Sequence, residues 1–354
     1  MKLSEFDYNL PNELIAQAPM KPRDHSRLLV LEKKTEEIKH QHFFEIVDYL
    51  SAGDVLVLNN SKVIPARLIG RKESGGEVEI FLSKRMSAIN DHENNNSEIW
   101  ECLIRGKVRP KMMIDFDNDL SAVIIANHSD GSNQLWQVEF NQTGQAFMNA
   151  IQEIGQVPLP PYIKKELTGD DQQDYQTVYA NNDQLGSVAA PTAGFHFTKE
   201  LLEKIKDKGI IIQYITLHVG LGTFLPVKTD EIHDHQMHSE WVEVSKETIS
   251  IIQQAKNRGK KIIAVGTTSC RSLEAVWQKN DLKNDFVEWV DIFIYPGYEF
   301  KIVEALITNF HLPKSTLLML VSALAGKENI KKAYLEAIQN KYRFYSYGDA
   351  MLVV

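Results

Sequence analysis

Apolar residues in the second half of the chain form short runs that end in polar, glycine-containing loops. Residues 210–219 are almost continuously apolar or β-branched, which predicts a buried strand. Residues 261–265 form a similar run and lead through the loop 266–271 into a helical pattern. The loop 306–315 precedes an apolar helix predicted over 316–325. Strands ending in such loops are typical of α/β proteins, which bind ligands beyond the carboxyl ends of their strands.

Residues 186–198 show neither helical nor strand periodicity. Thr198 is a good N-cap residue for the amphipathic helix that follows, and this helix is predicted to end at Gly209. Free backbone N–H groups gather at a helix start, and Thr192 and His196 add side-chain donors and acceptors. Loops of this kind on a rigid scaffold usually bind a ligand, so we expect one here.

The pattern of apolar and polar positions changes in the middle of the chain, because helical periodicity fades between residues 61 and 141. Turn-rich segments separate short runs that predict strands at residues 67–71, 77–82, 99–105, 121–126 and 134–140. Such a series is typical of a small antiparallel barrel or sandwich. Since α/β character lies on both sides, we expect an α/β main domain over residues 1–60 and 150–354, with an inserted small antiparallel β-barrel domain over residues 61–149.

Composition restricts the class of protein. The 354 residues are 43% hydrophobic and 24% charged, and include two cysteines, too few for a disulfide framework. No apolar run approaches the roughly 20 residues of a membrane helix, and residues 1–7 lack a signal-peptide core. We therefore expect a cytoplasmic protein with no membrane partner. A net charge of −8 argues against a broad, nonspecific nucleic-acid binder but leaves room for a local basic face at residues 105–111.

Several familiar kinds of site are disfavoured. His233, His235 and His238 lie close together but match no standard zinc spacing, so we expect other roles for them and no metal. Gly220 and Gly222 begin a dinucleotide fingerprint whose third glycine is missing, which excludes a Rossmann dinucleotide site. The chain also has no Walker A sequence.

Three histidines, His196, His218 and His311, each follow or end an apolar segment. A single histidine in such a place is more often a satisfied core residue, but three of them in Gly/Pro-rich loops favour function. Each would cost about 1–3 kcal/mol if it were buried without partners. Residues 266–269 add hydroxyls and helix N–H groups that suit a ribose, a carboxylate or a phosphate.

Long ungapped stretches, spread nearly from end to end, carry a family resemblance. The clearest are residues 6–11 (FDYNLP), 59–67 (NNSKVIPAR), 189–198 (AAPTAGFHFT), 217–224 (LHVGLGTF), 308–313 (TNFHLP) and 345–351 (YSYGDAM). In these stretches the chain resembles the S-adenosylmethionine:tRNA ribosyltransferase-isomerases, the epoxyqueuosine-forming enzymes of queuosine biosynthesis. It departs from them at Phe195, where the family usually has leucine, and at Cys270, where an aliphatic residue is common.

The resemblance implies that the ribosyl moiety of S-adenosylmethionine is transferred and isomerised onto 7-aminomethyl-7-deazaguanine at the tRNA wobble position. The product is epoxyqueuosine-tRNA, and adenine and methionine leave. S-adenosylmethionine is then a ribosyl-donating cosubstrate, and no metal or other prosthetic group is implied. The partners are that tRNA and S-adenosylmethionine, and we expect a monomer. The family fold, an α/β domain with an inserted β-barrel, agrees with the pattern-based prediction.

This chemistry needs a base beside the sulfonium-activated ribose carbon and a proton donor for adenine. The acid–base candidates are His196, His218 and His311, followed by Asp349 and Glu240. The candidates for binding the cosubstrate are Thr192, Gly194, Gly220, Gly222, Thr267, Thr268 and Arg271. Candidates for contacts with tRNA are the cations at 105–111 with Lys164 and Lys165, and the aromatic residues Tyr342, Phe344, Tyr345 and Tyr347, which alternatively belong to the core.

Three other functions remain open from the residues. An S-adenosylmethionine-dependent methyltransferase would use the same cosubstrate but leave adenosylhomocysteine. A noncatalytic RNA-binding module is a different class, against which the polar loops and net acidity count. A hydrolase would use Cys270, whose place before a helix favours a thiolate, although a small buried filler is the preferred interpretation.

Overall fold

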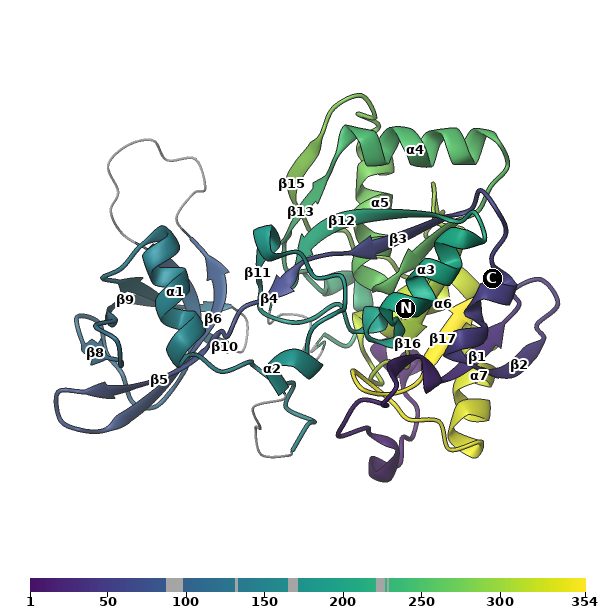
Figure 1. Cartoon of the computed structure of the whole chain (residues 1–354). Helices are drawn as coiled ribbons and strands as arrows, with labels where there is room; N and C mark the ends of the chain where they lie inside the picture. The colour runs from purple at the N-terminus through teal and green to yellow at the C-terminus, as the bar shows by residue number, and fades with distance from the viewer. Residues whose placement is uncertain (87–97, 131–132, 165–170, 221–226, 228) are drawn as a thin grey trace.

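The computed structural model describes residues 1–86, 98–130, 133–164, 171–220, 227 and 229–354. An α/β domain with a nine-stranded sheet stands beside a closed six-stranded barrel, as Figure 1 shows. The predicted fold class, an α/β main domain with an inserted antiparallel β-barrel, is confirmed. No helix within the described residues is long and apolar enough to cross a membrane.

The large sheet is mixed. Its strands, in spatial order, are β15 (Phe286–Val290), β13 (Glu240–Val244), β12 (Ile211–His218), β3 (Val55–Asn59), β14 (Ile262–Val265), β16 (Ala305–Asn309), β17 (Ala350–Val353), β1 (Arg27–Leu31) and β2 (Ile38–His42). The four strands from β12 to β16 are parallel, and β17 is antiparallel to β16. The carboxyl ends of these four strands therefore meet the start of β17 at one edge of the sheet.

Helices cover both faces of this sheet because its central strands are apolar on both sides. Val55 and Val57 of β3 pack in the cluster that includes α4 (Lys246–Asn257), α5 (Gly266–Lys279), α6 (Thr316–Ala325) and α7 (Lys327–Gln339). Leu56 and Leu58 point to the other face, toward α3 (Lys199–Asp207) and the 3-10 helix η4 (Phe43–Tyr49). The predicted cap is confirmed, since the Thr198 hydroxyl accepts a hydrogen bond from the Leu201 N–H over 3.1 Å.

The barrel closes in the order β10-β7-β6-β5-β8-β9. Its strands are β5 (Arg67–Lys72), β6 (Glu77–Arg85), β7 (Glu98–Arg105), β8 (Met113–Asp115), β9 (Ser121–Asp130) and β10 (Asn133–Phe140). Helix α1 (Gly144–Ile154) packs Phe147, Ala150 and Ile151 into the barrel core. The predicted boundary at residue 149 thus falls inside a helix whose later residues still contact the barrel.

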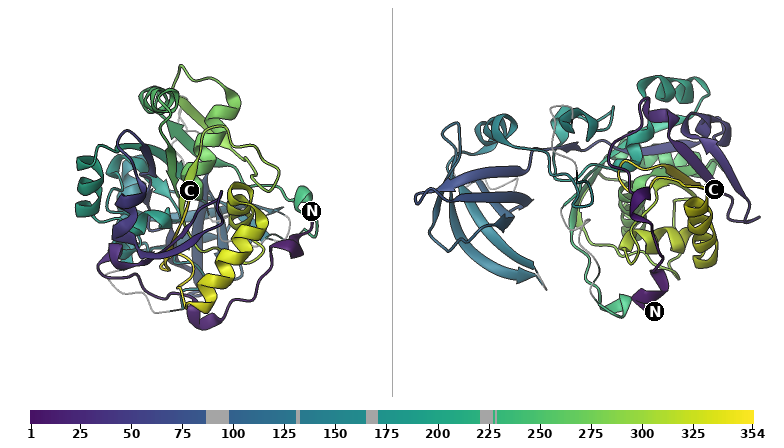
Figure 2. Two further views of the ribbon diagram at one scale, coloured as in Figure 1. Left: turned by 90° about the vertical axis from the view of Figure 1, so that its right-hand side faces the viewer. Right: turned by 90° about the horizontal axis from the view of Figure 1, so that it is seen from below.

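The chain enters and leaves the barrel at one place, on the side that faces the α/β domain in the right-hand view of Figure 2. Arg67 and Gln156 exchange backbone hydrogen bonds of 3.0 and 2.8 Å across the two passages. Nearby, β4 (Lys62–Val63) and β11 (Leu185–Ser187) form a short parallel pair, and α2 (Asp171–Asp174) follows the barrel in sequence. An inserted domain whose two ends lie side by side leaves the surrounding fold intact.

Candidate active site

A cavity lies at the edge of the sheet where the parallel strands end. Its volume is about 80 Å³, which is below the roughly 300–1,000 Å³ of typical small-molecule sites. The lining residues are Tyr162, 189–193, Val219, 266–268, 308–312, Leu317, Tyr345 and Ser346. None of these described lining residues is an aspartate, glutamate, lysine or arginine. The cavity therefore has an uncharged wall of hydroxyl, amide, imidazole and apolar groups.

His311 belongs to this wall and is held on three sides. Its Nε2 lies 2.8 Å from Thr308 Oγ1, and its backbone N–H donates to the Tyr334 hydroxyl over 3.0 Å. Its carbonyl oxygen accepts a hydrogen bond from the Tyr8 hydroxyl. Burial lowers the pKa of His311 to about 3, so the ring is neutral near pH 7. A neutral imidazole has one donor nitrogen and one acceptor nitrogen.

His196 lies behind the cavity wall in a short relay of side chains. Its Nδ1 is 2.7 Å from Ser26 Oγ, and its Nε2 is 3.2 Å from Nδ2 of Asn309. The same Asn309 Nδ2 also donates to the Tyr345 carbonyl over 3.0 Å. Because an amide N–H can only donate, Nε2 is the acceptor and the His196 proton resides on Nδ1. Burial, with smaller contributions from Arg343 and Arg23, lowers the pKa of His196 to about 3.

The predicted threonines come together in the cavity. Thr192 starts the 3-10 helix η6 (Thr192–His196), while Thr267 and Thr268 lie in the first turn of α5. Gly266 has a φ of 85°, which lets the chain turn directly from β14 into α5. Within the described residues, Thr268 Oγ1 is buried without a hydrogen-bond partner. These three residues therefore share one wall of the cavity.

The predicted glycines have other surroundings. A Cβ on Gly194 would stand 1.9 Å from the Tyr179 hydroxyl oxygen and 2.8 Å from Thr177 Cγ2. Gly194 is therefore required by packing, and it is not among the lining residues. The Gly220 N–H donates to Glu240 Oε1 over 3.4 Å. Gly222 lies outside the described residues.

Glu240 and Arg271 form a buried ion pair, with exposed side-chain fractions of 6% and 8%. The Arg271 Nε–H also donates to the Ile292 carbonyl over 3.2 Å, while within the described residues its second terminal nitrogen has no partner. Neither residue lines the cavity. Each of the two charges is neutralised by the other, and losing either one would leave a buried charge without a partner.

Asp349 is a buried anchor at the start of β17. Its carboxylate accepts hydrogen bonds from the Arg27 and Arg343 backbone N–H groups over 3.1 and 2.8 Å. The Arg343 guanidinium adds two more contacts of 3.3 and 3.1 Å. With its oxygens occupied, this carboxylate fixes the 343–349 turn, and Asp349 is not among the cavity-lining residues.

His218 also lies beside the cavity wall rather than in it, since its neighbour Val219 is the lining residue. The His218 ring packs so closely on Gly186 that a Cβ there would be 3.0 Å from Cε1. Burial lowers the pKa of His218, and Glu243 partly opposes that shift. Its Nδ1 has no hydrogen-bond partner in the part of the chain that the structure describes.

The remaining candidates from the sequence are the histidines of residues 233–238 and Cys270. The described residues hold no group of three or more metal-type side chains, and the rings of His233 and His235 pack edge-on against Tyr295 and Phe293. Cys270 is fully buried, and burial raises the pKa of its thiol, which disfavours a thiolate nucleophile.

The aromatic and basic candidates for tRNA contacts differ in exposure. Tyr342, Phe344 and Tyr347 are at most 2% exposed and pack in the core, and only Tyr345 reaches the cavity. In the barrel, the Arg105 side chain is 78% exposed beside Glu79. Lys165 lies outside the described residues. The exposed barrel cations therefore remain available to a polyanion, and the buried rings do not.

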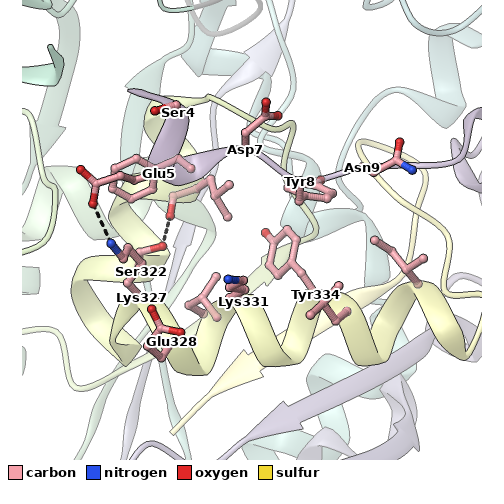
Figure 3. A pocket seen from close by; sticks show the side chains of 15 residues that line it. Ser4, Glu5, Asp7, Tyr8, Asn9, Ser322, Lys327, Glu328, Lys331 and Tyr334 are labelled. Atoms are coloured by element: carbon pink, nitrogen blue, oxygen red, sulfur yellow. Dashed lines mark hydrogen bonds and ion pairs between the residues drawn. The ribbon is translucent and has the colours of Figure 1, made fainter. Parts of the chain in front are cut away.

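A second hollow, shown in Figure 3, lies between the N-terminal segment and helices α6 and α7. Glu5 and Lys327 pair across it over 2.7 Å. Tyr8 and Tyr334, whose rings meet edge-on at 5.2 Å, line this hollow and hold the backbone of His311. The hollow is larger than the cavity at the strand ends but contains none of the predicted site residues. Its tyrosines fix the backbone of His311, which lines the cavity at the strand ends.

Sequence reasoning missed the residues that position the candidates. Asn309 and Tyr8 both stand in stretches that carry the family resemblance. A polar residue directly at the end of an apolar run, as Asn309 is, was the available signal. The partners of these residues lie far away in sequence, so only the fold reveals their roles.

Comparisons with known proteins agree with this architecture. A model of the family described as queuosine biosynthesis protein matches residues 3–353. The chain is 51% identical over 356 residues to the S-adenosylmethionine:tRNA ribosyltransferase-isomerase of Thermotoga petrophila, with all of both chains covered. The crystal structure of the S-adenosylmethionine tRNA ribosyltransferase of Thermotoga maritima matches with a TM-score of 0.56 and 42% identity, covering 99% of this chain and 100% of the other. The chain therefore belongs to the queuosine biosynthesis protein family.

Proposed function

We propose that this protein transfers and isomerises the ribosyl moiety of S-adenosylmethionine onto 7-aminomethyl-7-deazaguanine at the tRNA wobble position. The products are epoxyqueuosine-tRNA, adenine and methionine. The proposal rests on full-length similarity to a S-adenosylmethionine:tRNA ribosyltransferase-isomerase. It is supported by a cavity that gathers His311, Thr192, Thr267 and Thr268 at one sheet edge. In this proposal the enzyme is a cytoplasmic monomer without a prosthetic group.

Within this mechanism the cavity binds the cosubstrate and His311 is the leading acid–base group. The base removes the proton from the ribose carbon beside the sulfonium, and a donor protonates the departing adenine. His196 acts through Asn309 as a positioning residue, because its ring lies behind the wall and is hydrogen-bonded to that side chain. An uncharged, largely apolar wall strengthens each remaining polar contact with the substrate.

The tRNA would approach the open mouth of the cavity with its anticodon loop. A wobble base in such a loop is already partly unstacked and is easier to present than a base in a duplex. The exposed barrel cations, Arg105 and Arg109 among them, are the proposed phosphate contacts. They would hold the RNA while the α/β domain carries out the chemistry.

The direct test is incubation of the purified protein with S-adenosylmethionine and a tRNA that carries the 7-aminomethyl-7-deazaguanine precursor. Mass analysis of the wobble nucleoside should show the added epoxy-cyclopentanediol, and adenine should appear in equal amount. Adenosylhomocysteine with a methylated nucleoside would instead identify a methyltransferase. Replacing His311 by Gln should lower adenine release at least a hundredfold, and near-normal release would remove His311 from the mechanism.

A further inference from the structure

Asn309 presents an unused acceptor at the cavity wall. Its side chain lies at the carboxyl end of β16, is 4% exposed and lines the cavity. Nδ2 is committed to two protein acceptors, His196 Nε2 and the Tyr345 carbonyl. These two contacts fix the orientation of the amide, and Oδ1 is left buried with no partner in the described chain. A buried carbonyl oxygen without a donor is uncommon in a folded protein, and a water molecule or a ligand that reaches it would satisfy it.

A second unpartnered group lies on the neighbouring strand connection. Thr268 follows β14, which pairs directly with β16, and its hydroxyl oxygen is also buried without a partner in the described residues. Unlike Oδ1 of Asn309, a hydroxyl can both donate and accept. Adjacent strand ends beside the cavity thus hold one fixed acceptor and one adaptable donor, and both atoms are buried without a partner in the described residues.

The rest of the wall indicates which part of a ligand belongs there. Tyr162 and Tyr345 lie with ring centroids 4.7 Å apart, and Phe310, Leu312 and Leu317 add apolar surface. The described lining residues carry no charged side chain, so an ammonium, a carboxylate or a sulfonium would find no counter-ion. A flat, neutral group with an N–H donor next to an acceptor nitrogen fits this surface best.

We propose that Asn309 and Thr268 recognise the adenine ring of S-adenosylmethionine, with Asn309 Oδ1 accepting a hydrogen bond from the 6-amino group. The Thr268 hydroxyl donates to a ring nitrogen next to that amino group. This inference rests on the proposed function, since it takes S-adenosylmethionine as the substrate. It makes Asn309 a specificity-determining residue, because a base with a 6-oxo group places an oxygen against Oδ1.

The test compares two stable thioether analogues, S-adenosylhomocysteine and S-inosylhomocysteine, whose bases differ at the 6-position. Calorimetric titration of the full chain without tRNA should give at least tenfold tighter binding of the adenosyl compound. Asn309→Leu, which removes the acceptor at similar volume, should bring the two affinities within about threefold. Asn309→Ala serves the same purpose if the leucine variant fails to fold. Thr268→Val should weaken the adenosyl compound at least threefold.

Asn59→Ala is the matched control. Asn59 is another buried asparagine at a strand end, but both its amide atoms have protein partners: Nδ2 donates to Leu217 O, and Oδ1 accepts from the Ser61 and Leu217 N–H groups. Its loss should lower thermal stability and leave the base preference intact. Equal binding of the two analogues by the wild type, as a ribose-only contact would give, overturns the inference. So does a tenfold preference that survives in both Asn309 variants.

The failure of this inference and that of the proposed function are distinguishable. A protein that modifies tRNA but shows no base preference refutes the adenine contact alone. A protein that prefers the adenosyl analogue through Asn309 but leaves the precursor tRNA unchanged refutes the ribosyl transfer alone.

Discussion

The side-chain amide of Asn309 donates a hydrogen bond to Nε2 of His196 over 3.2 Å, and this contact assigns the histidine proton to Nδ1. The Nδ1–H then donates to Ser26 Oγ over 2.7 Å. Both ring nitrogens are thereby occupied inside the protein. The relay stabilises a neutral imidazole and at the same time orients the side-chain amide of Asn309, a residue that lines the cavity.

The two buried histidines should make the protein less stable in acid. The pKa values of His196 and His311 fall from 6.5 to about 3 on folding. The unfolded chain therefore binds more protons below pH 6.5, and stability is lost as the pH falls from 6.5 toward 3. Each histidine contributes at most about 1.4 kcal/mol per pH unit in that range. Urea unfolding between pH 4.5 and 7.5 gives the slope of the unfolding free energy against pH, which counts the protons taken up on unfolding. His196→Gln and His311→Gln should each reduce this uptake by about one proton. An unaltered slope would contradict the burial of neutral rings.

Asp349→Asn should destabilise the protein by about 3 kcal/mol, because it removes the charge that the Arg343 guanidinium and two backbone N–H groups share. Urea unfolding measures the effect. Asp7→Asn is the control, since Asp7 forms an exposed pair with Lys314 and should cost about 0.5 kcal/mol or less. A variant with wild-type stability but greatly reduced kcat would instead support the acid–base role expected from the sequence.

Gly194→Ala should cost about 1–3 kcal/mol because the new methyl group collides with the Tyr179 hydroxyl. Tyr179→Phe removes that oxygen and should restore part of the loss in the double variant. A double-mutant cycle of thermal or urea unfolding measures the coupling. Purely additive effects of the two changes would show that Gly194 is required for something other than this contact.

Glu240→Gln should destabilise by about 3 kcal/mol because it leaves the Arg271 guanidinium buried without its counter-charge. The pair Glu240→Met with Arg271→Met should recover much of that loss, since it removes both charges. The double variant should still bind S-adenosylhomocysteine within about threefold of the wild type. A loss of binding tenfold or more would return Arg271 to the cosubstrate contacts predicted from the sequence.

Arg105→Ala with Arg109→Ala should weaken tRNA binding and reduce the slope of log K against log salt by about 1.5 if each arginine contacts one phosphate. Filter binding across a series of salt concentrations measures both quantities. Lys246→Ala with Arg258→Ala, which removes the same charge from exposed positions at the two ends of α4, is the matched control. An unchanged slope in the barrel variant would place the RNA on another face.

The sequence predicted the sheet edge well because strand patterns and the loops after them are local features. Residues 210–219 and 261–265 supply β12 and β14 almost residue for residue, and His311 and Thr268 lie in the cavity as expected. In parallel strands the direction of the chain alone brings such loops to one edge. Fold class and the position of the cavity therefore follow from pattern.

The roles of individual polar residues could not be predicted in the same way. The side chains of Glu240 and Arg271 are of types that often act in catalysis or ligand binding. Only the structure shows that they form a buried ion pair with each other. Asn309 depends on contacts 113 and 36 residues away. The Tyr179 hydroxyl leaves no room for a Cβ at Gly194, and the sequence does not show that these two residues are neighbours. Long-range packing decides which polar group remains free for a ligand.

The central claim is that S-adenosylmethionine binds in the cavity at the strand ends and gives up its ribosyl moiety to the tRNA there. A dual-label experiment tests it most directly, with one isotope in the ribose and another in the sulfonium methyl group, and with precursor-bearing tRNA as acceptor. The account predicts the ribose label in the tRNA and the methyl label in free methionine, with both signals strongly reduced by His311→Gln. Methyl label in the tRNA, or ribose label retained in adenosylhomocysteine, would contradict it.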